Sequence, residues 1–128
     1  MSNAIVRLEN LYKYFGRFQA LNDVSFEVEP GEVICIIGPS GSGKSTTLRC
    51  INFLEKPDFG FVEVDGLRIE GGGQGRAYTK KVHQLRLKTG MVFQQFNLFQ
   101  HMSAIENVIE GLVTVKKMPK SEAVEIGE

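Results

Sequence analysis

The residues whose types and spacing could do chemistry lie together in one glycine-rich stretch. It consists of Gly38-Pro39-Ser40-Gly41-Ser42-Gly43-Lys44-Ser45 and fits the pattern G-x-x-x-x-G-K-[ST]. Glycine has no Cβ and adopts positive φ freely, so the backbone N–H groups of such a loop can point inward around a polyphosphate. The pattern therefore predicts a phosphate-binding loop.

Each part of the loop has an expected task in holding a nucleotide. Lys44 is expected to reach the β- and γ-phosphates, and the Ser45 hydroxyl is expected to bind Mg²⁺. The amides of Ser45 and Thr46 would face the phosphates, because the N-terminus of a helix attracts anions. The loop residues predicted to bind the nucleotide are Gly38, Ser40, Gly41, Ser42, Gly43, Lys44, Ser45 and Thr46.

Two elements must position this loop, a strand before it and a helix after it. Val33–Ile37 is continuously apolar, which predicts a strand buried on both faces, and residues 46–51 can continue as a helix. Cys35 lies in the predicted strand and Cys50 in the predicted helix, and they are not spaced as a metal or redox pair. We expect both cysteines to be core thiols.

Alternating apolar and polar residues predict an antiparallel sheet formed by the sequence on either side of the loop. The alternating stretches are residues 6–9, 24–29, 62–65 and 67–69. Asp65-Gly66 separates the last two stretches and predicts a hairpin turn. The aromatic cluster at residues 12–16 is expected to lie between the first two strands.

Beyond the hairpin the expected elements are a loop, a helix and a strand. Residues 70–75 are rich in glycine and predict a flexible loop. The stretch from Tyr78 to Leu87 has the spacing of an amphipathic helix. Met91–Phe93 is expected to be a short buried strand.

Two further helix starts follow. Ser103 and Glu106 have the spacing of a capping box, and apolar residues continue at helical spacing up to Leu112. Residues 119–122 open another helix, but only seven residues follow Ser121. Because an isolated helix needs about 12 residues, we expect this chain to be the N-terminal part of a longer protein.

Composition narrows the class of protein. The chain has 128 residues, of which 42% are hydrophobic and 23% charged, as in ordinary globular domains. Fifteen basic and fifteen acidic side chains give zero formal charge, so no nucleic-acid partner is predicted. Since no signal-peptide pattern and no apolar run of about 18 residues occurs, we expect a cytoplasmic protein without a membrane span.

With the loop, Phe15 and Met91-Val92-Phe93-Gln94 in this order, the sequence resembles the ATP-binding subunits of ABC transporters. Residues 90–99 and 105–108 resemble the branch that energises uptake of polar amino acids. The resemblance implies an α/β fold with a P-loop NTPase core, in which parallel strands surround the loop and its helix, an N-terminal antiparallel β subdomain and a truncated helical subdomain. We expect the core and β subdomain in residues 1–93, and the Q-loop and the start of the helical subdomain in residues 94–128.

The resemblance also implies roles for single residues. Phe15 would stack on adenine, and Gln94, as the Q-loop glutamine, would contact Mg²⁺ or the attacking water. Lys44 and Gln94 are then the expected catalytic residues, and Ser45 and Gln94 the expected metal ligands. ATP and Mg²⁺ are the implied cofactors.

Partners and location follow from the same resemblance. Four apolar residues after Gln94, namely Phe96, Leu98, Phe99 and Met102, would form a groove for a short helix of a membrane permease subunit. For Phe99 and Met102, the core of the helical subdomain is an equal alternative. The implied partners are the permease, through Gln94–Met102, and a second ATP-binding subunit in a homodimer, at the cytoplasmic face of the cell membrane.

The sequence departs from the family pattern where hydrolysis is concerned. The family uses an aspartate and a glutamate after a hydrophobic strand, and none of the three aspartates, Asp23, Asp58 and Asp65, has that context. His83 and His101 precede the expected switch histidine and are predicted at the surface. Residues 72–76 resemble the Ser-Gly-Gly-Gln signature but precede Gln94, so we do not assign that role to them. We expect this chain to bind ATP without hydrolysing it.

Two other classes remain possible from the sequence. A soluble ABC-type ATPase of DNA repair or translation would carry coiled-coil insertions or basic arms, which the sequence does not contain. A small P-loop kinase would need an arginine-rich lid, and only the phosphate loop favours it.

One further departure from the amino-acid uptake branch lies after Gln94. Gln100 stands where that branch usually has proline, which reduces the expected stiffness of the Q-loop region.

Overall fold

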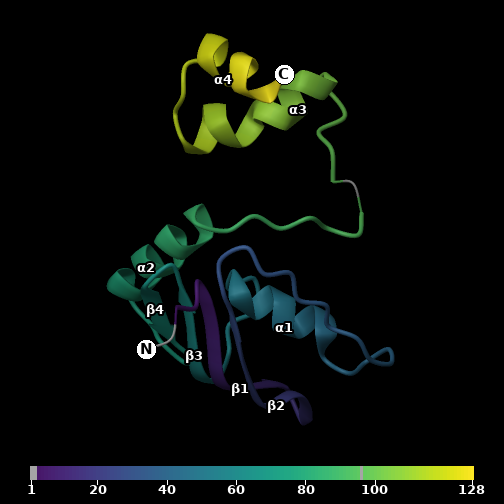
Figure 1. Ribbon diagram of the computed structural model, residues 1–128, viewed down its shortest axis with the longest axis vertical. Helices are drawn as coiled ribbons and strands as arrows, with labels where there is room; N and C mark the ends of the chain where they lie inside the picture. The colour runs from purple at the N-terminus through teal and green to yellow at the C-terminus, as the bar shows by residue number, and fades with distance from the viewer. Residues whose placement is uncertain (1–2, 96) are drawn as a thin grey trace. The chain divides into compact units, whose positions relative to one another are not determined.

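The computed structural model describes residues 3–95 and 97–128, and the chain divides into two compact units. The first unit ends at Met91, and the second is Val92–Glu128. Among the described residues, the first unit contains strands β1 (Val6–Phe15), β2 (Phe18–Val28), β3 (Phe59–Val64) and β4 (Leu67–Glu70), and helices α1 (Lys44–Ile51) and α2 (Arg76–Leu87) (Figure 1). The second unit is helical.

The four strands form one antiparallel sheet in the order β2-β1-β3-β4. One cross-strand row consists of Phe26, Leu8, Val62 and Ile69, which pair in register across all four strands. Directly opposite residues share a face of the sheet, so this row builds a continuous apolar surface. The predicted antiparallel sheet and its hairpin at Asp65-Gly66 are confirmed.

A bulge in β1 lets two leucines with an odd spacing reach the same core. Leu8 and Leu11 are both buried, although strict alternation would place them on opposite faces. The register shifts between them, and Asn10 has a φ of 51°. An extra residue in one strand restores the inward direction of the following side chain.

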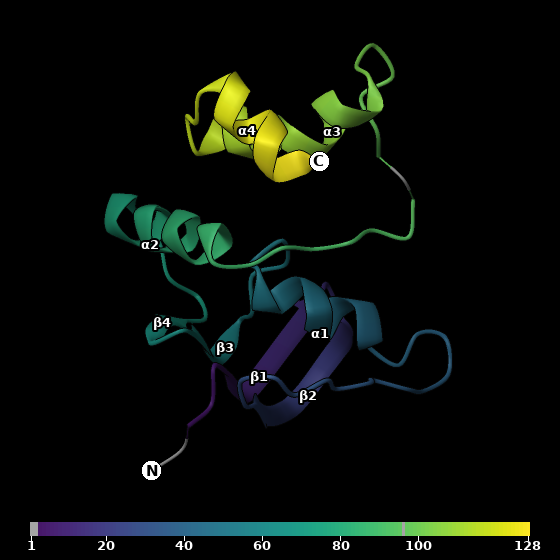
Figure 2. The same cartoon turned by 45° about the horizontal axis from the view of Figure 1, so that its top comes forward.

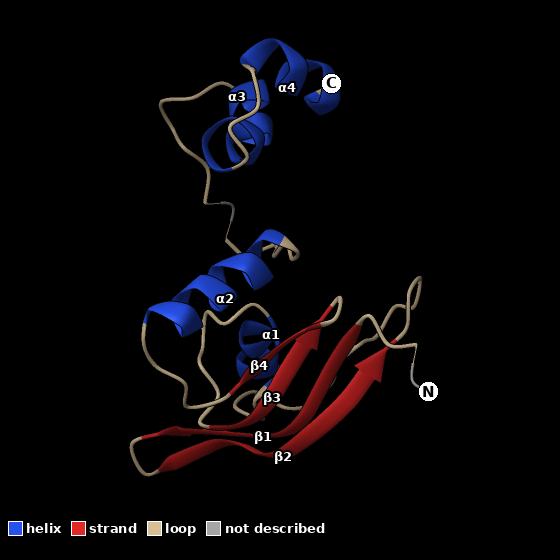
Figure 3. Ribbon diagram, turned by 90° about the vertical axis from the view of Figure 1, so that its left-hand side faces the viewer, coloured by secondary structure: helices blue, strands red, loops and turns tan. Residues whose placement is uncertain are grey.

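Helices α1 and α2 cover one face of this sheet (Figure 3). Cys50 of α1 and Leu85 of α2 are fully buried in the same cluster as Leu8 and Val62. Burial raises the pKa of the Cys50 thiol to about 11, so this cysteine is an inert core thiol as predicted. The predicted helix at residues 78–87 is confirmed, and it begins slightly earlier, at Arg76.

Two predicted strands are wrong. Val33–Ile37 and Met91–Phe93 belong to no sheet among the described residues, and Val33, Ile37 and Val92 are 88%, 90% and 97% exposed. Cys35 is exposed with its segment, so the prediction of a core thiol fails there. A parallel strand is buried only when neighbouring strands pair with it, and the described residues provide none for these two segments.

The second unit consists of α3 (Ala104–Glu110), a continuing π-helical turn η1 (Gly111–Val115) and α4 (Lys120–Gly127) (Figure 2). Both predicted helix starts are confirmed. A Cβ on Gly127 would lie 2.6 Å from Ile109 Cγ2, so the end of α4 packs closely on α3. No helix among the described residues has both the length and the apolar character needed to span a bilayer.

Candidate functional site

The glycine-rich loop ends in a helix start that is open to an anion. Helix α1 begins at Lys44, directly after Gly43, which offers no side chain to cap it. The first N–H groups of a helix have no partner within the helix, so the amides of Lys44, Ser45 and Thr46 remain available to a ligand. Together with the helix dipole, they form a site for a negatively charged group.

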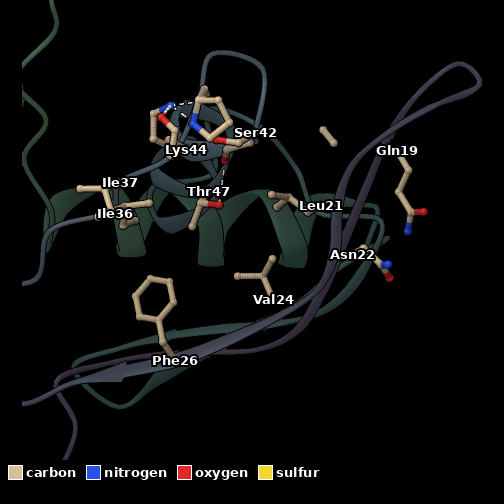
Figure 4. Close-up of a pocket in the computed structure, with 14 residues that line it drawn as sticks. Gln19, Leu21, Asn22, Val24, Phe26, Ile36, Ile37, Ser42, Lys44 and Thr47 are labelled. Atoms are coloured by element: carbon tan, nitrogen blue, oxygen red, sulfur yellow. Dashed lines mark hydrogen bonds between the residues drawn. The ribbon is translucent and has the colours of Figure 1, made fainter.

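Lys44 extends back over the loop that precedes it. Its Nζ donates hydrogen bonds to the carbonyl oxygens of Gly38 at 2.6 Å and Pro39 at 2.7 Å, and lies 3.4 Å from Ser42 Oγ (Figure 4). These groups are not deeply buried, so the ammonium lies at the mouth of the loop. A phosphate oxygen there would compete with the two carbonyls for the same ammonium protons.

Gly43 fixes the loop against the sheet. Its φ is 92°, and a Cβ at this position would lie 2.6 Å from the carbonyl oxygen of Ala20 on β2. The hydroxyl of Thr47 donates to the Gly43 carbonyl at 2.9 Å. Gly41 also has a positive φ, 80°, but faces open space. The expectation that these two glycines adopt positive φ is confirmed.

Most of the predicted loop residues line one pocket of about 400 Å³, named the polar pocket after its lysine and its three hydroxyl-bearing residues. Its walls are Ser40, Gly41 and residues 43–46 from the loop and α1, together with Phe18 and Ala20 from β2. The lining thus includes the residues of the helix start, whose amides have no partner within the helix, together with a lysine and the hydroxyl-bearing Ser45 and Thr46. This set of donors suits a polyphosphate, which presents only acceptors.

Gly38 and Ser42 line a second pocket of about 530 Å³, and Gly43 and Lys44 line both pockets. Val24 and Phe26 point from β2 toward the helix that carries Thr47 in this region (Figure 4). Ile37 completes an apolar lining from the exposed segment before the loop. Gln19, Asn22, Lys44 and Thr47 also line this pocket, so its walls combine apolar and polar side chains.

The aromatic residues near the loop are arranged differently from the expectation. Phe15 lies in β1, not in a loop between strands, and its ring is 44% exposed with Lys13 Nζ 5.2 Å from its centroid. The two-residue turn Gly16-Arg17 pairs Phe15 with Phe18, and Phe18 lines the polar pocket. Phe18 was not predicted, although the spacing Phe-x-x-Phe around that turn is a signal for it in the sequence.

Gln94 belongs to the second unit, where it is exposed, and its expected contact with Mg²⁺ remains a prediction. Of the expected groove residues, Leu98 is 64% and Phe99 49% exposed, Met102 is half-buried, and Phe96 lies outside the described residues. Asn107, which the sequence did not single out, ties this stretch to α3. Its Nδ2 donates to the carbonyls of Phe99, Met102 and Ser103, and its Oδ1 accepts from the Phe99 amide.

The three aspartates have structural partners in the first unit. Asp23 accepts a hydrogen bond from Asn10, Asp58 accepts one from the Tyr14 amide at 2.8 Å, and Asp65 pairs with Lys88 at 3.0 Å. None of the three is among the residues that line the polar pocket. No group of three or more His, Cys, Asp or Glu side chains that could hold a metal occurs in the described part of the chain.

The glycine-rich stretch at residues 72–76 has a packing explanation. A Cβ on Gly72 would meet the Asp58 carbonyl at 3.2 Å, and one on Gly73 would collide with the Tyr78 ring. Gly72 N donates to the Pro57 carbonyl at 3.0 Å. These glycines let the loop pass close to the start of β3. His83 and His101 are exposed, as predicted.

Known proteins resemble this chain over most of its length. The family described as ABC transporter matches residues 21–126. The chain is 47% identical to the L-cystine transport system ATP-binding protein TcyN of Escherichia coli, over 92% of this chain and 47% of the relative. It is 44% identical to the general L-amino acid transport ATP-binding protein AapP of Rhizobium johnstonii, over 94% of this chain and 45% of the relative. The chain therefore spans about half the length of the curated relatives it matches.

Among solved structures, the chain is similar to the ATP-binding cassette MJ0796, determined as a dimer in a post-hydrolysis state with ADP and Pi. The TM-score is 0.76 and the sequence identity is 35%. The match covers 95% of this chain and 53% of the cassette.

Proposed function

Because this chain belongs to the ABC transporter family, we propose that it is the phosphate-loop portion of an ATP-binding subunit that energises import of polar amino acids. The single observation that carries this proposal is the polar pocket in which the α1 amides, Lys44 and Ser45 converge. The names of the relatives, which specify L-cystine and general L-amino acid transport, support the substrate class.

The nucleotide fits the donors of the pocket. The amides of Lys44, Ser45 and Thr46 bind the phosphates, and the Lys44 ammonium leaves the Gly38 and Pro39 carbonyls to contact the β- and γ-phosphates. The Ser45 hydroxyl would be a ligand of Mg²⁺, and the ion would supply positive charge that neutralises the phosphates. By its resemblance to the Q-loop glutamine, Gln94 would be a ligand of that metal or would orient the attacking water.

Binding of MgATP to the 128-residue chain tests this proposal, with isothermal titration in the presence of Mg²⁺ and again with EDTA. Ser45→Ala should remove most of the Mg²⁺ dependence of the ATP affinity, because the hydroxyl that contacts the metal is lost. Ser40→Ala is the matched control, since this serine lines the same pocket and is not expected to contact Mg²⁺. A folded chain that does not bind ATP would disprove the proposal.

Binding and hydrolysis should separate in this chain. Asp23, Asp58 and Asp65 are engaged in the β subdomain, so none of them is in place to hold Mg²⁺ or to polarise a water beside the loop. Steady phosphate release that Lys44→Ala abolishes would contradict this part of the proposal.

The proposed docking stretch for the permease consists of the exposed Leu98 and Phe99 and the half-buried Met102. Two large apolar side chains at the surface of a loop favour a protein partner over solvent. In cells that express the complete transporter, Leu98→Ser should reduce amino-acid uptake and assembly with the permease and leave ATP binding unchanged. Val108→Ser is the control, because Val108 is 63% exposed on α3, nearly the same as Leu98.

Equal losses for Leu98→Ser and Val108→Ser would contradict a specific docking stretch.

We also propose that the complete subunit acts as a dimer at the cytoplasmic face of the membrane. The dimeric state of the similar cassette supports the dimer. The kinase alternative does not agree with membership of this family, and the names of the relatives favour import over DNA repair or translation.

A further inference from the structure

We infer that Phe18 forms part of the wall against which the base of a bound nucleotide lies, beside Phe15. This inference rests on the proposed nucleotide site and names a further residue in it. Phe18 lines the pocket that contains Lys44 and Ser45, so a nucleotide whose phosphates occupy that pocket has this ring within its surroundings.

The hairpin geometry brings the two rings to the same place. Phe15 and Phe18 are directly opposite across the turn Gly16-Arg17, and directly opposite side chains project to the same face of a sheet. Lys13 Nζ lies 5.2 Å from the Phe15 ring centroid and occupies part of its surroundings. Within the described part of the chain no cation lies over the Phe18 ring, so its face is the more accessible of the two.

The exposure of the Phe18 side chain also favours contact with a nucleobase. The Phe18 side chain is 59% exposed, although it stands at the start of a strand whose later apolar residue Leu21 is buried. An aromatic ring at the edge of a polar pocket gains by stacking on a flat ligand, because stacking removes apolar surface from water. A nucleobase is such a ligand, and every base presents a flat π face.

If Phe18 stacks on the base, it should increase the affinity for nucleotides without favouring one base over another. Stacking tolerates any base, so Phe18→Ala should weaken binding of ATP and GTP by a similar factor of roughly tenfold. Phe18→Leu should fall between the parent and Phe18→Ala, since it keeps apolar contact and loses the ring. Inorganic tripolyphosphate has no base, and its affinity should not change in either variant.

A control in the same sheet is available. Phe59 is 62% exposed on β3 and does not line the polar pocket. Phe59→Ala should therefore leave the affinities for ATP, GTP and tripolyphosphate unchanged. Circular dichroism and thermal unfolding of each variant verify that the fold is retained.

A spectroscopic readout is independent of affinity. The chain contains no tryptophan, so Phe18→Trp introduces a single indole. ATP should quench its fluorescence by stacking, tripolyphosphate should not, and the indole of Phe59→Trp should respond to neither.

The outcomes separate the inference from the proposed function. If the parent binds ATP and Phe18→Ala binds it equally well, Phe18 has no part in the wall and the inference is overturned while the proposed function stands. If Phe18→Ala loses tripolyphosphate as well, the ring supports the loop and not the base, which also overturns the inference. If the parent binds neither ATP nor tripolyphosphate, both the inference and the proposed function are disproved.

Discussion

The side chain of Asn107 forms hydrogen bonds with both the backbone amide and the backbone carbonyl of Phe99. The Phe99 amide donates to Asn107 Oδ1 at 2.9 Å, and Asn107 Nδ2 donates to the Phe99 carbonyl at 3.3 Å. The same Nδ2 also donates to the carbonyls of Met102 and Ser103. One side chain near the start of α3 therefore fixes the shape of the proposed docking stretch.

Removing this side chain should loosen the stretch. Asn107→Ala should speed hydrogen exchange at the Phe99 amide and lower the stability of the second unit by about 1 kcal/mol, because several exposed hydrogen bonds are lost together. Asn107→Asp keeps the acceptor for Phe99 N–H and should preserve protection at that amide. Hydrogen exchange is measured by NMR, and unchanged exchange at the Phe99 amide in Asn107→Ala would contradict this account.

The close contact of Gly43 with β2 predicts that Gly43→Ala lowers the stability of the chain more than Gly41→Ala does. Gly43→Ala should destabilise the chain by more than about 2 kcal/mol, because positive φ alone costs roughly 1–2 kcal/mol and the Cβ would collide with the Ala20 carbonyl. Gly41→Ala carries only the conformational cost, since nothing lies near its Cβ position. Urea unfolding measures both, and equal losses would argue against the packing of the loop on β2.

The capping box at α3 predicts a pH dependence. The Ser103 hydroxyl donates to Glu106 Oε1 at 2.9 Å. This hydrogen bond, followed by one from the Ser103 backbone, lowers the pKa of the Glu106 carboxyl below its ordinary value of 4.5. A carboxyl with a lowered pKa in the folded state stabilises the fold above its unfolded pKa, and this contribution is lost as pH falls through the folded pKa.

Ser103→Ala should therefore raise the pKa of Glu106 toward 4.5 and flatten the acid limb of the stability profile. An NMR titration of the Glu106 carboxyl gives the direction directly. An unchanged pKa in Ser103→Ala would show that the capping hydrogen bond does not hold the carboxylate.

Local signals in the sequence predicted most of the antiparallel sheet, because alternation at Val62 and Val64 depends only on which face of a strand is buried. The α/β class of the fold is confirmed by the similarity to a solved cassette. The exposure of Val33–Ile37 could not be predicted in the same way, since burial of an apolar run depends on whether other strands pair with it. Phe18 and Asn107 were not predicted, because pairing across a turn and bonds to a preceding loop leave no periodic pattern.

The exposed apolar segment before the loop predicts self-association. Val33 is 88% exposed in a segment that pairs with no strand among the described residues, and unpaired extended segments tend to pair with other chains. Val33→Lys should lower the average mass in sedimentation experiments at high protein concentration. Val115→Lys, at an exposed position of the second unit, is the control; equal effects would indicate a general gain in solubility.

The affinity of Lys44→Ala for MgATP tests most directly whether the loop binds nucleotide through the helix start and Lys44. The variant loses the ammonium that donates to the Gly38 carbonyl at 2.6 Å and that would be free to turn to a phosphate. A charged hydrogen bond is worth about 1.5–3 kcal/mol, so equilibrium titration should show a weakening of roughly 10- to 150-fold, with Lys116→Ala unchanged from the parent. Equal affinity of the parent and a folded Lys44→Ala variant, at matched salt, would contradict the account.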